Sequence, residues 1–230
     1  MAGGLARLNT TVRFGDSEQE VCFLRLAKLE EAAAFEGVLT AAEREQASSV
    51  SNPSQRSRFV VSRGLRRAML SDCTGVSADS LVFSHDGEGK PRVQGLTGWD
   101  FNISHAGDYV AAVVGRGSVG VDIEQCREVR DMESIVDRYF HPEEQAAWHG
   151  LPPALQPAAF FLLWSAREAA MKCAGLGLAK GLSVTRVDPG ILEQGQGTAR
   201  VGDRLLEVRS LSAPAGYAFV VCRQEASASI

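Results

Sequence analysis

Residues 101–124 read FNISHAGDYVAAVVGRGSVGVDIE and contain three short apolar runs separated by glycine-bearing turns. Runs of this length, rich in Val, Ile and aromatic residues, are typical of β-strands. Short turns between consecutive strands favour antiparallel pairing. We therefore expect an antiparallel meander of three strands, at Phe101–Ser104, Tyr109–Val114 and Val119–Glu124.

Helices and further strands are expected on both sides of this meander. Thr40 and Glu43 form a capping-box pattern that predicts a helix start, and Gly175 stands where a left-handed residue ends a helix. The expected helices are Leu39–Val50, Ser54–Leu70, Met132–Tyr139, one beginning at His141-Pro142-Glu143-Glu144, and Ala158–Ala174. The other expected strands are Val21–Leu26, Leu81–Phe83, Arg200–Leu211 and Tyr217–Cys222, with a turn over His85–Pro91.

Two segments of the chain are similar in sequence. SAPAGYAFVV at Ser212–Val221 resembles SHAGDYVAAVV at Ser104–Val114. The pattern of a long helix followed by antiparallel strands occurs twice, which fits a duplication; the alternative is a chance resemblance between two short segments. We therefore predict an α+β fold of two similar halves, residues 1–117 and 118–230, each an antiparallel sheet packed with a long helix.

Composition excludes several classes of protein. The 230 residues are 45% hydrophobic and 23% charged, as in soluble globular chains. The net charge of −4 argues against a nucleic-acid coat or a polybasic membrane binder. No apolar stretch approaches the ~20 residues that span a bilayer, and residues 1–10 lack a signal core. The five cysteines form no CxxC pair, so we expect a cytoplasmic protein without a disulfide framework or zinc cluster.

Two carboxylates share one face of the third predicted strand. Asp122 and Glu124 are two residues apart, so they lie about 7 Å apart along the strand and point to the same side. Like charges this close raise each other's pKa unless a cation lies between them. Oxygen ligands of this kind suit Mg²⁺. The alternative is a half-exposed strand whose wet face carries two acids.

A second candidate set lies on the predicted helix at Ala158–Ala174. In WSAREAAMK, residues Trp164, Glu168 and Lys172 form an i, i+4, i+8 row. The alternative is an ordinary Glu–Lys pair on an exposed helix. The apolar residues AAFFLLW before it predict a buried helix, where such a pair would be costly.

Basic and polar groups form a third set. Asn102-Ile103-Ser104-His105 ends the first strand of the meander, next to the acidic strand. Lys90, in Gly89-Lys90-Pro91, offers a cation suited to phosphate. A hydrogen-bonded structural histidine and a solvated lysine are the alternatives.

Five arginines follow one another on the predicted helix at Ser54–Leu70. Arg56, Arg63 and Arg67 fall within about 40° of one another on a helical wheel, whereas Arg58 and Arg66 point elsewhere. Guanidinium groups suit phosphate, although any one of them is commonly a solvated charge.

Several catalytic motifs are missing from the sequence. There is no GxGxxG after a strand, no GxxxxGK[ST], no GxSxG and no HExxH. The remaining carboxylates, Lys, His and Arg suit metal-assisted transfer of a phosphoryl-type group.

The ordered motifs FNISHAGDYVAAVV, VGVDIE and WSAREAAMK resemble the signatures of the 4′-phosphopantetheinyl transferase superfamily. The length and the leader LTAAEREQA…RFVVSRGLRR resemble its Sfp-type members, which are pseudodimers with the active site at the junction of two α+β halves. The resemblance implies transfer of the 4′-phosphopantetheine arm of coenzyme A to a serine of an acyl or peptidyl carrier domain, with release of adenosine 3′,5′-bisphosphate. It also implies a monomer that serves a polyketide synthase, a nonribosomal peptide synthetase or a fatty acid synthase.

The resemblance assigns roles by motif. Asp122, Glu124 and Glu168 would hold Mg²⁺ or Mn²⁺, and Glu168 would also be the general base. Lys172 would bind phosphate and stabilise developing charge. Coenzyme A would be contacted by Arg58, Arg63, Lys90, Ser104, His105 and Lys172. Arg167 departs from the pattern, because the family has Lys there; arginine keeps the charge, so we expect Arg167 to be able to contact phosphate.

Two other functions fit the same residues. One is a different Mg²⁺-dependent phosphoryl or nucleotidyl transfer that needs no carrier. The other is a non-catalytic module that binds carrier domains or coenzyme A, although such a module has no need of Asp122 or Glu168.

Overall fold

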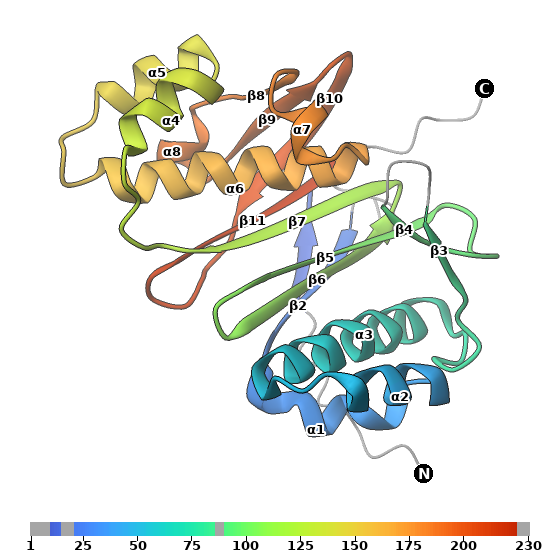
Figure 1. The fold of residues 1–230 in the computed structure, drawn as a ribbon. Helices are drawn as coiled ribbons and strands as arrows, with labels where there is room; N and C mark the ends of the chain where they lie inside the picture. Colours follow the sequence, from blue (N-terminus) through green and yellow to red (C-terminus); the bar gives the residue numbers. More distant parts are fainter. Residues whose placement is uncertain (1–9, 15–20, 86–89, 225–230) are drawn as a thin grey trace, which may run out of the picture.

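The computed structural model describes residues 10–14, 21–85 and 90–224, and the fold is α+β. In Figure 1 some of the strands lie between the long helices α3 (Pro53–Thr74) and α6 (Gln156–Ala174), and others lie beyond α6. Among these residues, none of the helices combines the length and apolarity that crossing a membrane requires.

The first sheet is four-stranded and packs against α3. Its strands are β1 (Thr10–Arg13), β2 (Val21–Lys28), β5 (Trp99–Ala106) and β6 (Tyr109–Arg116), in the order β1-β2-β6-β5. Phe101 and Val110 on one face of this sheet share a core with Val61 and Leu65 of α3. The remaining elements of this region are α1 (Ala32–Phe35), α2 (Ala41–Ser49) and the ribbon of β3 (Phe83–His85) and β4 (Pro91–Val93).

The second sheet is five-stranded and packs against α6. Its strands are β7 (Ser118–Gln125), β8 (Thr185–Val187), β9 (Gln196–Val201), β10 (Arg204–Ser210) and β11 (Tyr217–Gln224), in the order β7-β11-β10-β9-β8. Leu206 and Val220 of the sheet share a core with Leu163 and Ala170 of α6. The other helices here are α4 (Met132–Tyr139), α5 (Pro142–His149), α7 (Leu178–Gly181) and α8 (Ile191–Gln194).

Strand β7 joins the two sheets through an unusual set of hydrogen bonds. Alternate backbone N–H groups of β7 donate to side chains of β5: Val119 to Asp100 (3.0 Å), Val121 to Asn102 (3.0 Å) and Ile123 to Ser104 (3.4 Å). These side chains are buried, so each contact satisfies a main-chain donor that would be costly to leave unpaired. We call these three contacts the β5–β7 ladder. The side chains of Val119, Val121 and Ile123 fill a core between the sheets with Ala111 and Val113 of β6.

The predicted three-strand meander is wrong in its third strand. Strands β5 and β6 pair antiparallel as expected, but β7 pairs with β11 in the other sheet. The reason is that β6 already has β2 and β5 as its two neighbours. A single residue, Gly117 with φ 74°, separates β6 from β7, and two-residue loops are the commoner hairpin connection.

Most other predicted elements are confirmed. Helix α2 has Thr40 as its N-cap with the capping box to Glu43, α4 has the predicted bounds, and Gly175 ends α6 in the left-handed conformation. The expected strand Arg200–Leu211 is wrong, because a turn at 202–203 divides it into β9 and β10. The expected strand Leu81–Phe83 lies instead at Phe83–His85. Residues 86–89 of the expected turn and residues 1–9 lie outside the described residues.

The two sheets share a strand order. The first has β2-β6-β5 against α3, and the second has β7-β11-β10 against α6. This order is compatible with two similar halves, and the division at residues 117 and 118 stays a prediction.

Gly120 sets the distance between β7 and α6. A Cβ at this position would lie 2.1 Å from the Ala169 carbonyl oxygen and 2.5 Å from the Cys173 nitrogen, both backbone atoms of α6. Only a residue without a side chain lets the helix approach this closely. The approach matters because Asp122 and Glu124 follow Gly120 on the same face of the strand.

We predict that Gly120→Ala lowers the free energy of unfolding by about 2 kcal/mol or more, because helix and strand must move apart. Urea unfolding measures this. The matched control is Gly37→Ala, where an added Cβ meets nothing within 4 Å; its effect should stay within about 1 kcal/mol. Equal stability of the two variants would show that the close approach is not required.

Candidate active site

The predicted acidic residues of β7 and α6 meet on the α6 side of the second sheet. Asp122 is 2% exposed. Its Oδ1 lies 2.6 Å from Lys172 Nζ, and that nitrogen lies 3.5 Å from Glu168 Oε2. The charges of Asp122, Glu168 and Lys172 all affect the pKa of Glu124. We call these four residues the acidic cluster.

Ser104 ties the acidic cluster to the first sheet. Its hydroxyl donates to Asp122 Oδ1 (2.8 Å) and accepts from Lys172 Nζ (3.1 Å) and from the Ile123 N–H (3.4 Å). The single proton and both lone pairs of the hydroxyl are therefore in use. Ser104 orients Asp122 Oδ1, and the contacts draw residues of three separate elements together.

Burial and mutual repulsion shift the pKa values of the cluster. Burial, followed by the charges of Asp122 and Glu168, raises the pKa of Glu124 to about 7. Burial also raises the pKa of Glu168. Burial lowers the pKa of Lys172, but the carboxylates of Asp122 and Glu168 outweigh it, so the net pKa is raised. Carboxyl groups with raised pKa values in a partly enclosed site are ones that a further cation would stabilise in the charged form.

The donor atoms of the cluster fit a hard divalent cation. Asp122 Oδ2 is buried and has no hydrogen-bond partner, which leaves one carboxylate oxygen for a ligand. Carboxylates from Asp122, Glu124 and Glu168 are the oxygen ligands that Mg²⁺ takes. These three carboxylates are not the most closely spaced group of possible metal ligands. In the part of the chain that the structure describes, only Glu133, Asp137 and His149 place three ligand atoms within 4.8 Å of one another. In the acidic cluster the Lys172 ammonium contacts both Asp122 and Glu168.

A basic cavity lies on the other face of β5. It measures about 460 Å³ and is lined by residues of α3, β4 and β5: Gln55, Arg58, Phe59, Ser62, Arg63, Arg66, Pro91, Phe101, Ile103 and His105. We call it the arginine cavity. Burial and the neighbouring Arg58 lower the pKa of His105. Guanidinium groups beside apolar walls suit a phosphorylated ring compound.

Ser104 and His105 therefore face different sites. Successive residues of a strand point to opposite faces, so Ser104 contacts the acidic cluster and His105 lines the arginine cavity. Because β5 is the edge strand of its sheet, the two sites lie on opposite faces of the same sheet edge.

Lys90 lines a cavity together with Lys172 of the acidic cluster, and its charge is paired with Asp100. Its Nζ donates to Asp100 Oδ2 (2.6 Å) and to the Val119 carbonyl (2.9 Å). The residue lines a smaller cavity of about 210 Å³ together with Lys172, Asn102 and Gly175.

The predicted grouping of the arginines of α3 is wrong. Arg58, Arg63 and Arg66 line the cavity, whereas Arg67 is buried against Glu43 and the carbonyls of Ala78 and Leu81, away from it. Arg56 donates to the carbonyls of Val50 and Ser48. A helical wheel places Cα atoms, but side chains of this length reach around the helix to whichever partner is buried nearby.

The expectation that Arg167 can contact phosphate is also wrong. Its side chain is 1% exposed and pairs with Glu144 at 2.6 Å. It also donates to the carbonyls of Tyr139 and Leu182. Arg167 therefore holds α6 against α5, the C-terminal end of α4 and Leu182. Its hydrogen bonds go to these groups and not to the acidic cluster, although the next residue, Glu168, belongs to that cluster.

Sequence reasoning missed two parts of the site. Arg66 was assigned to another face of α3, and Asp100 and Asn102 were not recognised as partners of β7. The alternation of polar side chains at Asp100, Asn102 and Ser104 on one face of an apolar strand was the available signal.

Comparison with known proteins identifies the family. A model described as the 4′-phosphopantetheinyl transferase superfamily matches residues 118–222, and one described as 4′-phosphopantetheinyl transferase, N-terminal, matches residues 28–116. The chain is 32% identical to the 4′-phosphopantetheinyl transferase psf-1 of Bacillus pumilus, over 75% of this chain and 73% of that protein. The chain belongs to the 4′-phosphopantetheinyl transferase superfamily.

Two further relatives carry the same description. The 4′-phosphopantetheinyl transferase HetI of a Nostoc species is 31% identical over 61% of this chain and 63% of its own length. The 4′-phosphopantetheinyl transferase of Bacillus subtilis is 29% identical over 61% of this chain and 62% of its own length. The matched region thus spans somewhat less than two thirds of these two relatives.

The role of Arg167 can be tested by unfolding. We predict that Arg167→Met lowers the free energy of unfolding by about 3–5 kcal/mol, because it leaves Glu144 charged and buried without its partner. The double variant Arg167→Met, Glu144→Gln should recover part of this loss, since it removes the stranded charge. Urea unfolding of both variants measures the difference. A fully stable single variant with weakened binding of phosphorylated ligands would contradict the structural role.

Proposed function

We propose that this chain transfers the 4′-phosphopantetheine arm of coenzyme A to a serine hydroxyl of an acyl or peptidyl carrier domain and releases adenosine 3′,5′-bisphosphate. The observation that carries the proposal is the meeting of acids from β7 and α6 at the edge strand that also borders the arginine cavity. Membership of the superfamily supports it.

The ligand is proposed to lie across the edge of β5. Arg58, Arg63 and His105 would bind the phosphate-bearing nucleotide end in the arginine cavity. Lys90 would border the ligand in the smaller cavity next to Lys172. The diphosphate would then lie at the acidic cluster, where Lys172 offers a cation.

Asp122, Glu124 and Glu168 would hold Mg²⁺, or Mn²⁺ in its place. The bound ion would neutralise the diphosphate and make the departing phosphate a better leaving group. Ser104 would act through Asp122, since its contacts fix Oδ1 and leave Oδ2 for a ligand.

The transfer is a displacement at phosphorus. The carrier serine oxygen forms a bond to the phosphorus that bears the pantetheine arm, the bridging P–O bond breaks, and its electron pair leaves with adenosine 3′,5′-bisphosphate. Glu168 would take the serine proton, since burial raises its pKa above the ordinary value of a carboxyl group. Lys172 remains charged at neutral pH and would stabilise the charge that develops on the phosphate oxygens.

The biological setting is part of the proposal. The carrier domain would belong to a polyketide synthase, a nonribosomal peptide synthetase or a fatty acid synthase. The enzyme would act in the cytoplasm as a monomer, with both parts of the site supplied by one chain.

Mass measurement of a carrier tests the proposal. Incubation with coenzyme A, Mg²⁺ and an apo carrier domain should add the mass of one phosphopantetheine to the carrier. Asp122→Ala and Glu168→Ala should each lower the rate by about 100-fold or more, because each removes a charged group at the reacting phosphorus. The matched control is Glu128→Ala, an exposed acid four positions after Glu124 and outside the cluster.

Two outcomes would contradict the proposal. One is the absence of any mass gain on several different carrier domains. The other is a folded Asp122→Ala, Glu168→Ala double variant that transfers at the rate of the wild type.

A further inference from the structure

Arg66 lines one wall of the arginine cavity, although the helical wheel places it on another face of α3 than Arg63. Its side chain is only 7% exposed, yet it lines the cavity with Arg58 and Arg63. Among the described residues it donates one hydrogen bond, from Nη2 to Glu43 Oε1 at 3.1 Å, and its Nε is buried without a partner. Arg66 therefore keeps donor capacity beyond its one contact.

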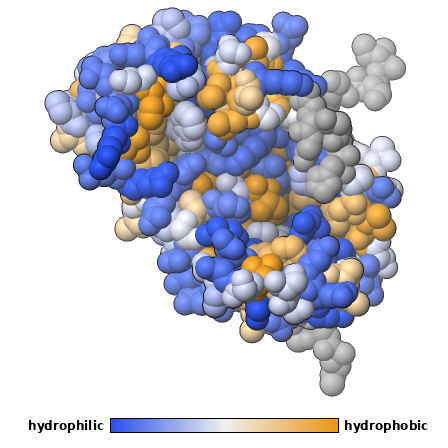
Figure 2. All heavy atoms as spheres, in the orientation of Figure 1, coloured by the Kyte–Doolittle hydropathy of each residue, from blue (hydrophilic) through white to orange (hydrophobic). Residues whose placement is uncertain are grey.

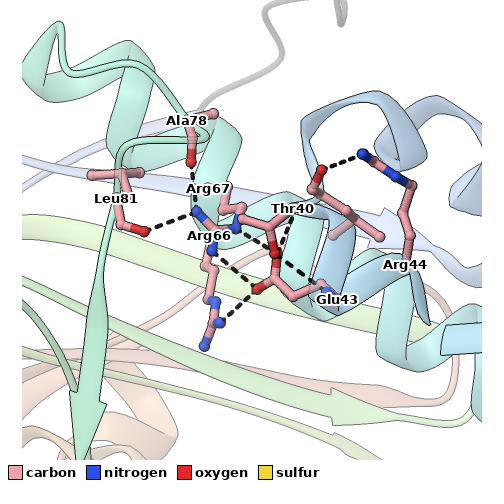
Figure 3. Close-up of polar contacts among 8 residues, drawn as sticks. Thr40, Glu43, Arg44, Arg66, Arg67, Ala78 and Leu81 are labelled. Atoms are coloured by element: carbon pink, nitrogen blue, oxygen red, sulfur yellow. Dashed lines mark hydrogen bonds and ion pairs between the residues drawn. The ribbon is translucent and has the colours of Figure 1, made fainter. Parts of the chain in front are cut away.

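Glu43 holds Arg66 from outside the cavity. Figure 3 shows its carboxylate between Arg66 and Arg67, with Thr40 on the α2 side. Oε1 accepts from both arginines, and Oε2 accepts from Arg67 Nε (2.7 Å) and from the Thr40 N–H (3.0 Å). Glu43 is not among the residues that line the cavity, so it can reach a ligand only through Arg66.

Phe83 fixes Arg66 from a second side. The guanidinium carbon of Arg66 lies 3.9 Å from the centre of the Phe83 ring, and Phe83 packs edge-on against Phe101 in the cavity wall. With a carboxylate on one side and an aromatic face on another, the guanidinium is held in one orientation before any ligand arrives.

The charges around this end of the cavity do not balance. Glu43 is one carboxylate shared between Arg66 and Arg67, while Arg58 and Arg63 add two further cations on the same helix. Burial raises the pKa of Glu43, but hydrogen bonds from Arg67 and Thr40 outweigh it and lower the pKa overall, so it stays ionised. The remaining positive charge favours a doubly charged anion such as a phosphate monoester.

We propose that Arg66 is a recognition residue for the phosphate monoester of the bound nucleotide, and that Glu43 is a positioning residue that acts through Arg66. This inference rests on the proposed function, in which the diphosphate lies at the acidic cluster and the monoester is the phosphate left for the arginine cavity.

Binding of two matched ligands tests the inference. Calorimetry should compare coenzyme A with 3′-dephospho-coenzyme A, which differ only in the monoester. Arg66→Met should weaken coenzyme A binding about tenfold or more, as expected for a lost hydrogen bond to a charged group, and change dephospho-coenzyme A binding less than about threefold. The matched control is Arg56→Met, which removes the same charge from the same helix but outside the cavity; it should leave both affinities within about threefold.

A double-mutant cycle separates the positioning role from general damage. Glu43→Gln should weaken coenzyme A binding by a smaller factor, and should weaken it no further in the Arg66→Met background. In transfer assays both single variants should raise KM for coenzyme A and leave kcat near that of the wild type. Should Glu43→Gln fail to fold, the comparison of Arg66→Met with Arg56→Met decides the inference.

Several results would overturn the inference. Equal weakening of both ligands by Arg66→Met, or an equal effect of Arg56→Met on coenzyme A, would show that Arg66 does not read the monoester. If the wild type transfers to carriers but the variants show either of these patterns, this inference alone is refuted. Wild type that binds coenzyme A selectively through Arg66 but never transfers would refute the proposed function and leave the inference standing. Wild type that binds neither ligand would refute both.

Discussion

The rest of the site depends on the β5–β7 ladder. Three buried side chains of β5 take the place that a neighbouring strand would have, and accept the N–H groups that β7 leaves free. This arrangement lets β7 belong to the second sheet while it lies against the first. The last step of the ladder, Ser104, also contacts Asp122 and Lys172, so the contact that joins the sheets also orients the acidic cluster.

The same geometry divides the site by charge. One face of β5 looks towards carboxylates with raised pKa values, and the other looks towards a cavity lined by arginines. A ligand with a neutralising cation on its diphosphate and a phosphate monoester at its far end satisfies both environments.

On the surface drawn in Figure 2, hydrophilic residues predominate and apolar groups gather in smaller patches.

Local chemistry allowed much of this to be predicted from the sequence. The capping box at Thr40, the left-handed Gly175 and the two faces of the acidic strand each depend on a few residues, and the structure has them as expected. The cluster of Asp122, Glu168 and Lys172 was also predicted correctly as a set of neighbours. The pairing of β7 with the second sheet was not predicted, because it depends on which partners β6 already has, and one of them, β2, lies 81 to 93 positions away in the chain.

Charged residues were hardest to place. Arg67 and Arg167 read as phosphate ligands in the sequence, but each is buried against a carboxylate 23 or 24 positions away. The helical wheel places Arg66 on another face of α3, but its side chain lines the cavity. A long side chain goes where a buried partner satisfies it, and that partner is not visible in local spacing.

The central claim is that the acidic cluster holds a divalent cation against the diphosphate of coenzyme A. Electron–nuclear double resonance on the protein with bound Mn²⁺ and coenzyme A tests it most directly, because hyperfine coupling reports which nuclei lie beside the metal. The proposed metal site predicts coupling to phosphorus that is lost in Asp122→Asn. Coupling to an imidazole nitrogen that disappears in His149→Ala, with none to phosphorus, would place the metal at Glu133, Asp137 and His149 and contradict the claim.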